Sequence, residues 1–148
     1  MDKEVSVFKM DKILSMHKER EAEVDLIREF KALGAWAAHM DTTVDGFPDI
    51  LVLGRKTLMI EMKYVNTKNP RIWEIMEPTQ PVFMHNVRNK GMDEIYLCIA
   101  SEDNFKVFST DGILELSMTG AKIDELALML CTSSAHEVAL FLLERPEL

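Results

Sequence analysis

At 148 residues the chain has the length of one ordinary domain, and its 47% hydrophobic content suffices for a single core over residues 1–148. Cys98 and Cys131 are too far apart in sequence to indicate a disulfide framework or a cysteine-ligated metal. The net charge of −8 argues against tight nonspecific binding to polyphosphate, unless part of that charge holds divalent cations. The charged N-terminal sequence and the absence of a long apolar stretch predict a cytoplasmic protein with reduced cysteines and no membrane partner.

The first half of the chain predicts one helix and one short strand before a loop. Residues 11–33 have the charge content of a surface helix, and Gly34 is a typical helix stop. Their apolar stripe consists of Val24, Ile27, Phe30 and Leu33. Residues 35–40 are apolar and suit a short strand, and the polar residues 41–48 form a loop.

Residues 49–53 and 57–63 predict an antiparallel hairpin, because two apolar, partly β-branched runs are separated only by Gly54, Arg55 and Lys56. Both faces of these runs are largely apolar, as in central strands that are covered on two sides. A charged side chain within them therefore needs an explanation.

The second half predicts further strands and helices around the same sheet. Residues 66–78 form a polar connection that contains Trp73, and residues 81–90 form a helix that ends at Gly91. Strands are expected at 94–100 and 105–108, and helices at 122–130 and 135–143. The order predicts a mixed α/β domain with a central sheet flanked by helices.

The hairpin brings three charged residues together if its loop has three residues. Leu53 then faces Thr57, and Asp49 lies opposite Glu61. Lys63 shares their face, because side chains along a strand alternate with period two. An alternative two-residue type II′ turn at Gly54 and Arg55 would shift the register and separate the two carboxylates.

Two carboxylates and an ammonium group in a half-buried sheet indicate a cation site. Carboxylates at such a separation repel each other, and one would have to take up a proton unless a cation compensates. Oxygen ligands suit Mg²⁺ or Mn²⁺, which activate water and polarise a phosphate oxygen. Lys63 is placed to orient the attacking water or to offset charge in the transition state.

The order Pro48-Asp49, then Glu61-Met62-Lys63, resembles the PD-(D/E)xK nuclease motif. The run from Gly46 to Gly54, followed by residues 59–63, looks like the VRR-NUC branch of that superfamily and is similar to archaeal Holliday-junction resolvases. The resemblance covers roughly residues 19–107, and it implies a restriction-endonuclease-like core.

The resemblance also implies roles for individual residues. It makes Asp49, Glu61 and the backbone carbonyl of Met62 metal ligands. A helix before the hairpin contributes a glutamate, which is Glu23, with Glu19 as its substitute, and a glutamine after a variable loop corresponds to Gln80. The glutamate–arginine pair of the resolvases is Glu23-Val24 here, which puts a resolvase-type substrate in doubt.

Each of these residues also has an ordinary structural interpretation. Asp49 fits a turn before a strand, and Glu61 and Lys63 fit the ends of an edge strand. Glu23 fits a solvated helix face, and Gln80 fits a helix cap beside Pro81. Basic residues after the hairpin form either solvated surface or a strand-binding rim: Lys68, Arg71, His85, Arg88 and Lys90. The histidines His17, His39 and His136 show no metal-ligand spacing, and the methionines and Trp36 are expected in the core.

The function expected from these observations is metal-dependent endonucleolytic cleavage of DNA by Asp49, Glu61, Lys63, Glu23 and Gln80. By resemblance to minimal VRR-NUC proteins, we expect a homodimer that acts on structured or branched DNA, and the short chain is compatible with a phage or mobile-element protein. A catalytically inactive nucleic-acid-binding or structural module that retains the nuclease fold is the alternative, which the acidic charge favours slightly. A protein-interaction module would leave the charged cluster unexplained.

Overall fold

The molecule is organised around a six-stranded mixed sheet in the order β1-β2-β3-β4-β5-β6. The computed structural model describes the backbone of residues 3–145 and the side chains of residues 10 and 12–145. The strands are β1 (Trp36–His39), β2 (Ile50–Leu53), β3 (Thr57–Tyr64), β4 (Ile95–Ala100), β5 (Phe105–Ser109) and β6 (Leu128–Thr132). Within this sheet only β3 and β4 run parallel, and the helices that connect them cross one face.

The β2–β3 hairpin has the register that the three-residue loop predicts. Leu53 pairs with Thr57 and Ile50 with Ile60, so the type II′ alternative is wrong. Alternation places Ile50, Val52, Leu58 and Ile60 in one core and turns the intervening side chains to the other face.

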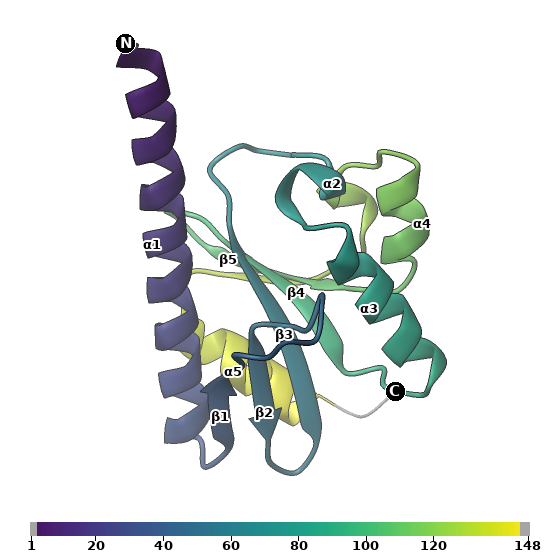
Figure 1. Cartoon of the computed structure of the whole chain (residues 1–148). Coiled ribbons are helices and arrows are strands. Elements are labelled where there is room, and N and C mark those ends of the chain that lie inside the picture. The colour runs from purple at the N-terminus through teal and green to yellow at the C-terminus, as the bar shows by residue number, and fades with distance from the viewer. Residues whose placement is uncertain (1–2, 146–148) are drawn as a thin grey trace.

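Helices cover both faces of the sheet (Figure 1). α1 (Lys3–Ala32) and α5 (Ala135–Glu144) contact each other and close the first core around Leu26, Phe30 and Val138. On the opposite face, α2 (Ile72–Ile75), α3 (Thr79–Asn89) and α4 (Ile113–Met118) close a second core around Ile72, Met84 and Leu97. The N-terminal part of α1 extends beyond the sheet, toward the end where β3 finishes.

The predicted helix over residues 122–130 is wrong. Residues Ile123–Glu125 form a single 3₁₀ turn, and the following residues form β6, which pairs with β5 at the edge of the sheet. The run Leu126 to Leu130 has good helix formers, but pairing with an available strand overrides that local preference.

Other boundaries also differ from the sequence-based expectations. The first helix is longer than residues 11–33, whereas Gly34, with φ 92°, ends it as expected. The short helices α2 and α4 were not predicted, because four and six residues give too little periodicity to detect.

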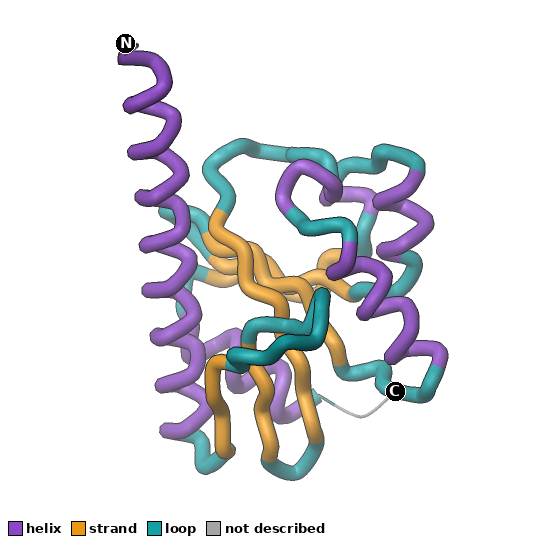
Figure 2. The backbone as a smooth tube through the Cα atoms, in the orientation of Figure 1, coloured by secondary structure: helices purple, strands orange, loops and turns teal. Residues whose placement is uncertain are grey.

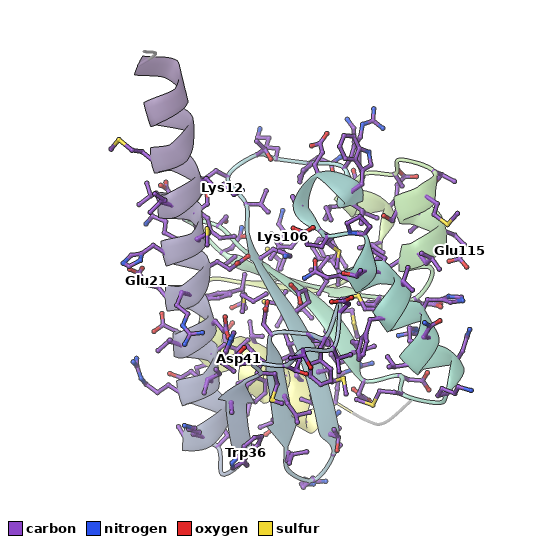
Figure 3. All side chains as sticks on the ribbon, in the orientation of Figure 1. Lys12, Glu21, Trp36, Asp41, Lys106 and Glu115 are labelled. Carbon is purple, nitrogen blue, oxygen red and sulfur yellow. The ribbon has the colours of Figure 1, made fainter. Side chains whose placement is uncertain are left out.

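Several side chains that were expected in the core lie at the surface. Trp36 is 52% exposed on the edge strand β1, where Figure 3 shows it at the outer edge of the sheet. Met10, Met16 and Met118 are exposed as well. Within residues 3–145, no helix is long and apolar enough to cross a membrane.

Candidate functional site

Asp49 and Glu61 meet on the face of the sheet that α3 covers. Asp49 directly precedes β2, and continuing the observed register places it opposite Glu61 in β3. The Asp49 carboxylate accepts a hydrogen bond from the Met62 amide at 3.0 Å, which fixes it against β3. Two acidic groups therefore lie together on adjacent central strands.

The Glu61 side chain is 1% exposed and has two polar partners. Lys63 Nζ lies 3.1 Å from Glu61 Oε2, and the Gln80 amide donates to the same oxygen at 2.9 Å. The other oxygen, Oε1, has no hydrogen-bond partner among the described residues. Burial, followed by repulsion from Asp49, raises the Glu61 pKa to about 9.

Gln80 links the start of α3 to Glu61 through two hydrogen bonds. Its Oε1 accepts a hydrogen bond from the Glu77 backbone amide at 2.9 Å, as a helix-start residue does, while its Nε2 reaches Glu61. The start of α3 thus orients one of the two carboxylates.

Two further carboxylates approach from α1. The Glu23 side chain is 5% exposed and contacts His39 at the end of β1, and Arg20 lies 3.7 Å from it. Burial raises the pKa of Glu23 and that of Glu19, and in both cases Asp49 adds to the increase. Glu19 is also close to Lys63 and to the Tyr64 backbone. Both glutamates that the resemblance offered therefore face the site.

We call Glu19, Glu23, Asp49 and Glu61 the carboxylate cluster, because Asp49 acts electrostatically on each of the other three. Lys63 is the cation at its centre. Burial acts to lower the Lys63 pKa, but Glu61 and Glu19 outweigh that effect and leave the pKa above its ordinary value. Lys63 is therefore a protonated ammonium at neutral pH and is suited to stabilising negative charge.

His39 is the member of this arrangement that the sequence analysis missed. A lone histidine at the end of a strand shows no motif spacing in the sequence. Only the pairing of β1 with β2 shows that His39 lies near the carboxylates. His39 pairs with Ile50, next to Asp49, and its Nδ1 contacts the Glu23 carboxylate. It was expected to be ordinary, yet it positions one of the four clustered acids.

The loop between β1 and β2 packs against the start of α3. Figure 2 shows this loop in teal, reaching across the strands toward α3. Gly46 has φ 79°, and a Cβ there would lie 2.2 Å from the Thr79 carbonyl oxygen. Phe47 packs on Phe83 with ring centroids 5.2 Å apart. Because of these contacts the loop holds Asp49 on the same side of the sheet as Gln80.

The five basic residues of the expected rim do not gather at the carboxylate cluster. Lys68 is exposed in the loop after β3, and Arg71 donates to the Gly120 carbonyl at 2.6 Å. His85 lies 3.9 Å from Glu115 and Arg88 lies 3.7 Å from Asp111, both partners belonging to the α4 region. Lys90 follows the far end of α3 from Gln80. Of these five residues, Lys68 is the nearest in sequence to the end of β3.

The residues present fit a divalent cation only with help from the backbone. In the described part of the chain, no three histidine, cysteine, aspartate or glutamate side chains form a ready metal-binding group. The cluster nevertheless offers Asp49, the partnerless Glu61 oxygen and buried Glu23, which are hard oxygen donors. Two or three carboxylates, a main-chain carbonyl such as that of Met62, and water make an acceptable ligand set for Mg²⁺.

Comparison with known proteins locates a related fold. No model of a protein family matches the sequence, and neither does any curated protein. Among solved structures, the chain is similar to Hjc, a Holliday junction resolvase of the archaeal hyperthermophile Archaeoglobus fulgidus, with a TM-score of 0.55 and 20% identity. The match covers 81% of this chain and 98% of the resolvase chain. The two chains share a fold. The predicted fold class, a mixed sheet flanked by helices, is confirmed.

Proposed function

We propose that this protein is a metal-dependent endonuclease that hydrolyses DNA phosphodiesters and acts on structured or branched DNA. The observation that carries the proposal is the pairing of Asp49 with buried Glu61, one oxygen of which has no partner. Without a cation, burial and Asp49 hold the Glu61 pKa at about 9, so the like-charged pair is costly to keep ionised. A protein with no use for a cation would gain stability by losing one of these acids.

The chemistry we infer assigns one task to each residue. A bound Mg²⁺ or Mn²⁺ ion would supply an activated water and polarise a phosphate oxygen. Asp49, Glu61, Glu23 and the Met62 carbonyl would hold that ion. Lys63, kept protonated by its neighbours, would stabilise negative charge that grows on the phosphate as water attacks in line.

Two positioning residues support this assignment. Gln80 holds the Glu61 oxygen that faces Lys63, and its 2.9 Å hydrogen bond limits the rotation of the carboxylate. His39 does the same for Glu23. Partners of this kind fix the orientation of ligands, and their loss typically costs about 10–100-fold in metal affinity or activity.

The substrate part of the proposal is supported by the likeness in fold to a Holliday junction resolvase. A junction offers equivalent strands, and a homodimer would present two sites related by a twofold axis. The part of α1 that extends from the body carries four exposed apolar side chains suited to such a contact: Met10, Ile13, Leu14 and Met16. Sedimentation of the wild type and of Ile13→Glu would test the dimer. A wild-type dimer that Ile13→Glu converts to a monomer would support it, and a monomeric wild type would show that this part of the proposal is wrong.

The decisive experiment measures metal binding and cleavage together. Mg²⁺ or Mn²⁺ at roughly ten times Kd should raise Tm by about 3–6 °C, since the unfolded chain does not bind the ion. Asp49→Asn should remove that shift. Supercoiled, linear and four-way-junction DNA should be cut in Mg²⁺ or Mn²⁺ and remain intact in EDTA.

Failure can take two forms with different meanings. If millimolar ions leave the Tm of the wild type unchanged, the cation site does not exist and the nuclease proposal is wrong. If the ion binds but every DNA stays intact while being retained in gel shifts, the chain is the binding module that its charge of −8 allows.

A further inference from the structure

A groove of about 340 Å³ lies beyond the carboxyl ends of β3 and β4, between the loop after β3 and the turn before β5. Its floor is apolar and consists of Val65, Ile99, Phe108 and Ile123. β3 and β4 are the parallel pair of the described sheet, and ligands of α/β sheets bind outside the carboxyl ends of such strands. We call it the carboxyl-end groove.

Two amide side chains that line the carboxyl-end groove, Asn66 and Asn69, keep hydrogen-bonding groups available for a ligand. Asn69 uses its carbonyl oxygen to accept from the Asp124 amide at 3.2 Å, which leaves its amide nitrogen available. Among the described residues, the Asn66 side chain has no hydrogen-bond partner. Amide groups above an apolar floor suit a flat heterocycle whose edge carries donors and acceptors.

Two lysines line the groove, Lys68 and Lys106. Neither Lys68 nor Lys106 forms an ion pair within residues 3–145, and Lys106 is half-buried. A partly desolvated ammonium without a partner is unfavourable, and an anionic ligand would relieve it. Three acids line the same groove, Glu102, Asp103 and Asp124, so its net charge is −1 (two lysines against three acids). That balance opposes contact with the many phosphates of a duplex, so a phosphate is accommodated only where it meets a lysine directly, as at half-buried Lys106.

The strand register relates the groove to the carboxylate cluster. Lys63 pairs with Ile99 across β3 and β4, and Ile99 pairs with Lys106 across β4 and β5. The three side chains form a row on one face, and with strands about 4.8 Å apart the two lysine Cα atoms are separated by about 10 Å. Figure 3 shows Lys106 over the sheet, between α1 and α2.

We propose that the carboxyl-end groove binds one unpaired nucleotide of the substrate strand, adjacent to the phosphate that is cut. Its base lies on the apolar floor with its edge at Asn66 and Asn69, and its phosphate lies at Lys106. This inference rests on the proposed function, because it takes the cut phosphate to be at Glu61 and Lys63. It adds a preference: the strand must be unpaired beside the cleavage position.

The test compares Lys106→Ala with Lys31→Ala. The second variant is the control, because it removes an exposed lysine in the last turn of α1, which does not line the groove. Fluorescence anisotropy in Ca²⁺ measures binding of a labelled single strand, a flapped duplex and a fully paired duplex. Lys106→Ala should weaken the first two about tenfold and lower the slope of log K against log salt by about one. Both variants should bind the paired duplex equally.

The base contact is tested with oligonucleotides that carry one abasic position. Moving that position along a flap should reveal one place, next to the cut phosphate, where loss of the base weakens binding to the wild type. Asn66→Ala should lose this sensitivity and bind the intact flap as the wild type binds the abasic one. Equal sensitivity at all positions would overturn the assignment of a base site.

The outcomes separate this inference from the nuclease proposal. If DNA is cut but Lys106→Ala and Lys31→Ala bind every substrate alike, the groove proposal is overturned and the nuclease remains. If no DNA is cut but Lys106→Ala selectively weakens binding of the flap, the groove stands as a binding site. If the wild type binds no DNA in Ca²⁺, both are wrong.

Discussion

Two buried glutamates on opposite faces of the same sheet have contrasting surroundings. Glu61 lies within the carboxylate cluster, with Lys63 as its close cation. Glu94, just before β4, has two cations instead: Lys56 Nζ lies 3.9 Å from one oxygen and Arg145 lies 3.7 Å from the other. The first arrangement has an excess of negative charge, and the second is compensated.

The Glu94 group behaves as a structural tie. Tyr96 donates its hydroxyl to Glu94, and Arg145 donates to that same hydroxyl. Burial, and then Glu94, raise the Tyr96 pKa, so the phenol stays a donor. Lys56 also donates to the Arg145 carbonyl at 2.7 Å and so joins the end of α5 to the β2–β3 loop. Burial of a carboxylate alone therefore does not indicate a reactive site, and neither does an oxygen without a hydrogen-bond partner, because Glu94 Oε1 also has none among the described residues. The uncompensated charge is what makes Glu61 the candidate.

The largest expected difference is in cleavage. Glu61→Gln should reduce DNA cleavage at least about a hundredfold by removing a charged ligand for the cation. Glu94→Gln should leave cleavage intact and instead lower the free energy of unfolding by about 3–5 kcal/mol, because it removes the negative charge that faces Lys56 and Arg145. Cleavage assays and urea unfolding of both variants measure the contrast. If Glu94→Gln is fully folded and still loses cleavage, the distinction between the two glutamates is wrong.

Lys63 sharpens the comparison, since it is the cation next to Glu61. Lys63→Ala should reduce cleavage on the order of a hundredfold by removing transition-state stabilisation, while Mg²⁺ still raises Tm. Lys56→Ala is the matched variant from the Glu94 group and should lower Tm without changing the metal response. Equal loss of metal affinity in Lys63→Ala and Glu61→Gln would show that Lys63 is structural.

Gly46 tests whether Asp49 must be held beside Glu61. A Cβ at Gly46 meets the Thr79 carbonyl at 2.2 Å, so Gly46→Ala should displace the loop and lower cleavage about tenfold. Gly91→Ala, at the other end of α3, has positive φ as well but meets no atom within 4 Å. Both variants should lower Tm through backbone strain, Gly46→Ala more because of the added clash, and only Gly46→Ala should lose activity.

The smallest expected effect is on stability against pH. The Glu61 pKa is about 9 in the folded protein against 4.5 ordinarily, so the folded state retains a proton that the unfolded chain releases. In EDTA, this contribution to stability is complete below pH 4.5 and is lost as the pH rises toward 9. Glu61→Gln should remove the decline and raise Tm by roughly 5 °C at pH 8. A wild type with the same Tm at pH 5 and pH 8 would contradict the assigned pKa.

Local sequence patterns correctly predicted those parts of the molecule whose structure depends on residues close together in the sequence. Alternation of apolar residues and a loop of three residues sufficed for the β2–β3 register, and the register placed Asp49 beside Glu61. The residues 128–132 could not be predicted as a strand, because their pairing with β5 is a tertiary interaction and their composition suits a helix.

The site was predictable in its centre and less so in its surroundings. Glu23 and Gln80 came from resemblance to a family, and the structure brings both near the paired acids. His39 and Lys106 carry no sequence signal, because each matters only through a neighbour on another strand. The rim of Lys68, Arg71, His85, Arg88 and Lys90 was expected from the charge of these residues alone, which does not say in which direction each side chain points.

The short loop between β2 and β3 also governs when the carboxylates meet during folding. A hairpin closes in about 1–10 μs, so Asp49 and Glu61 approach each other early. Gln80 and Glu23 arrive only when the β3–β4 crossover closes and α1 docks, which are slower steps with larger loop entropy. Before the helices dock, Glu61 is not yet buried and both carboxylates are ionised at neutral pH, so they repel each other. We therefore expect Asp49→Asn to refold faster than the wild type in stopped-flow experiments in EDTA.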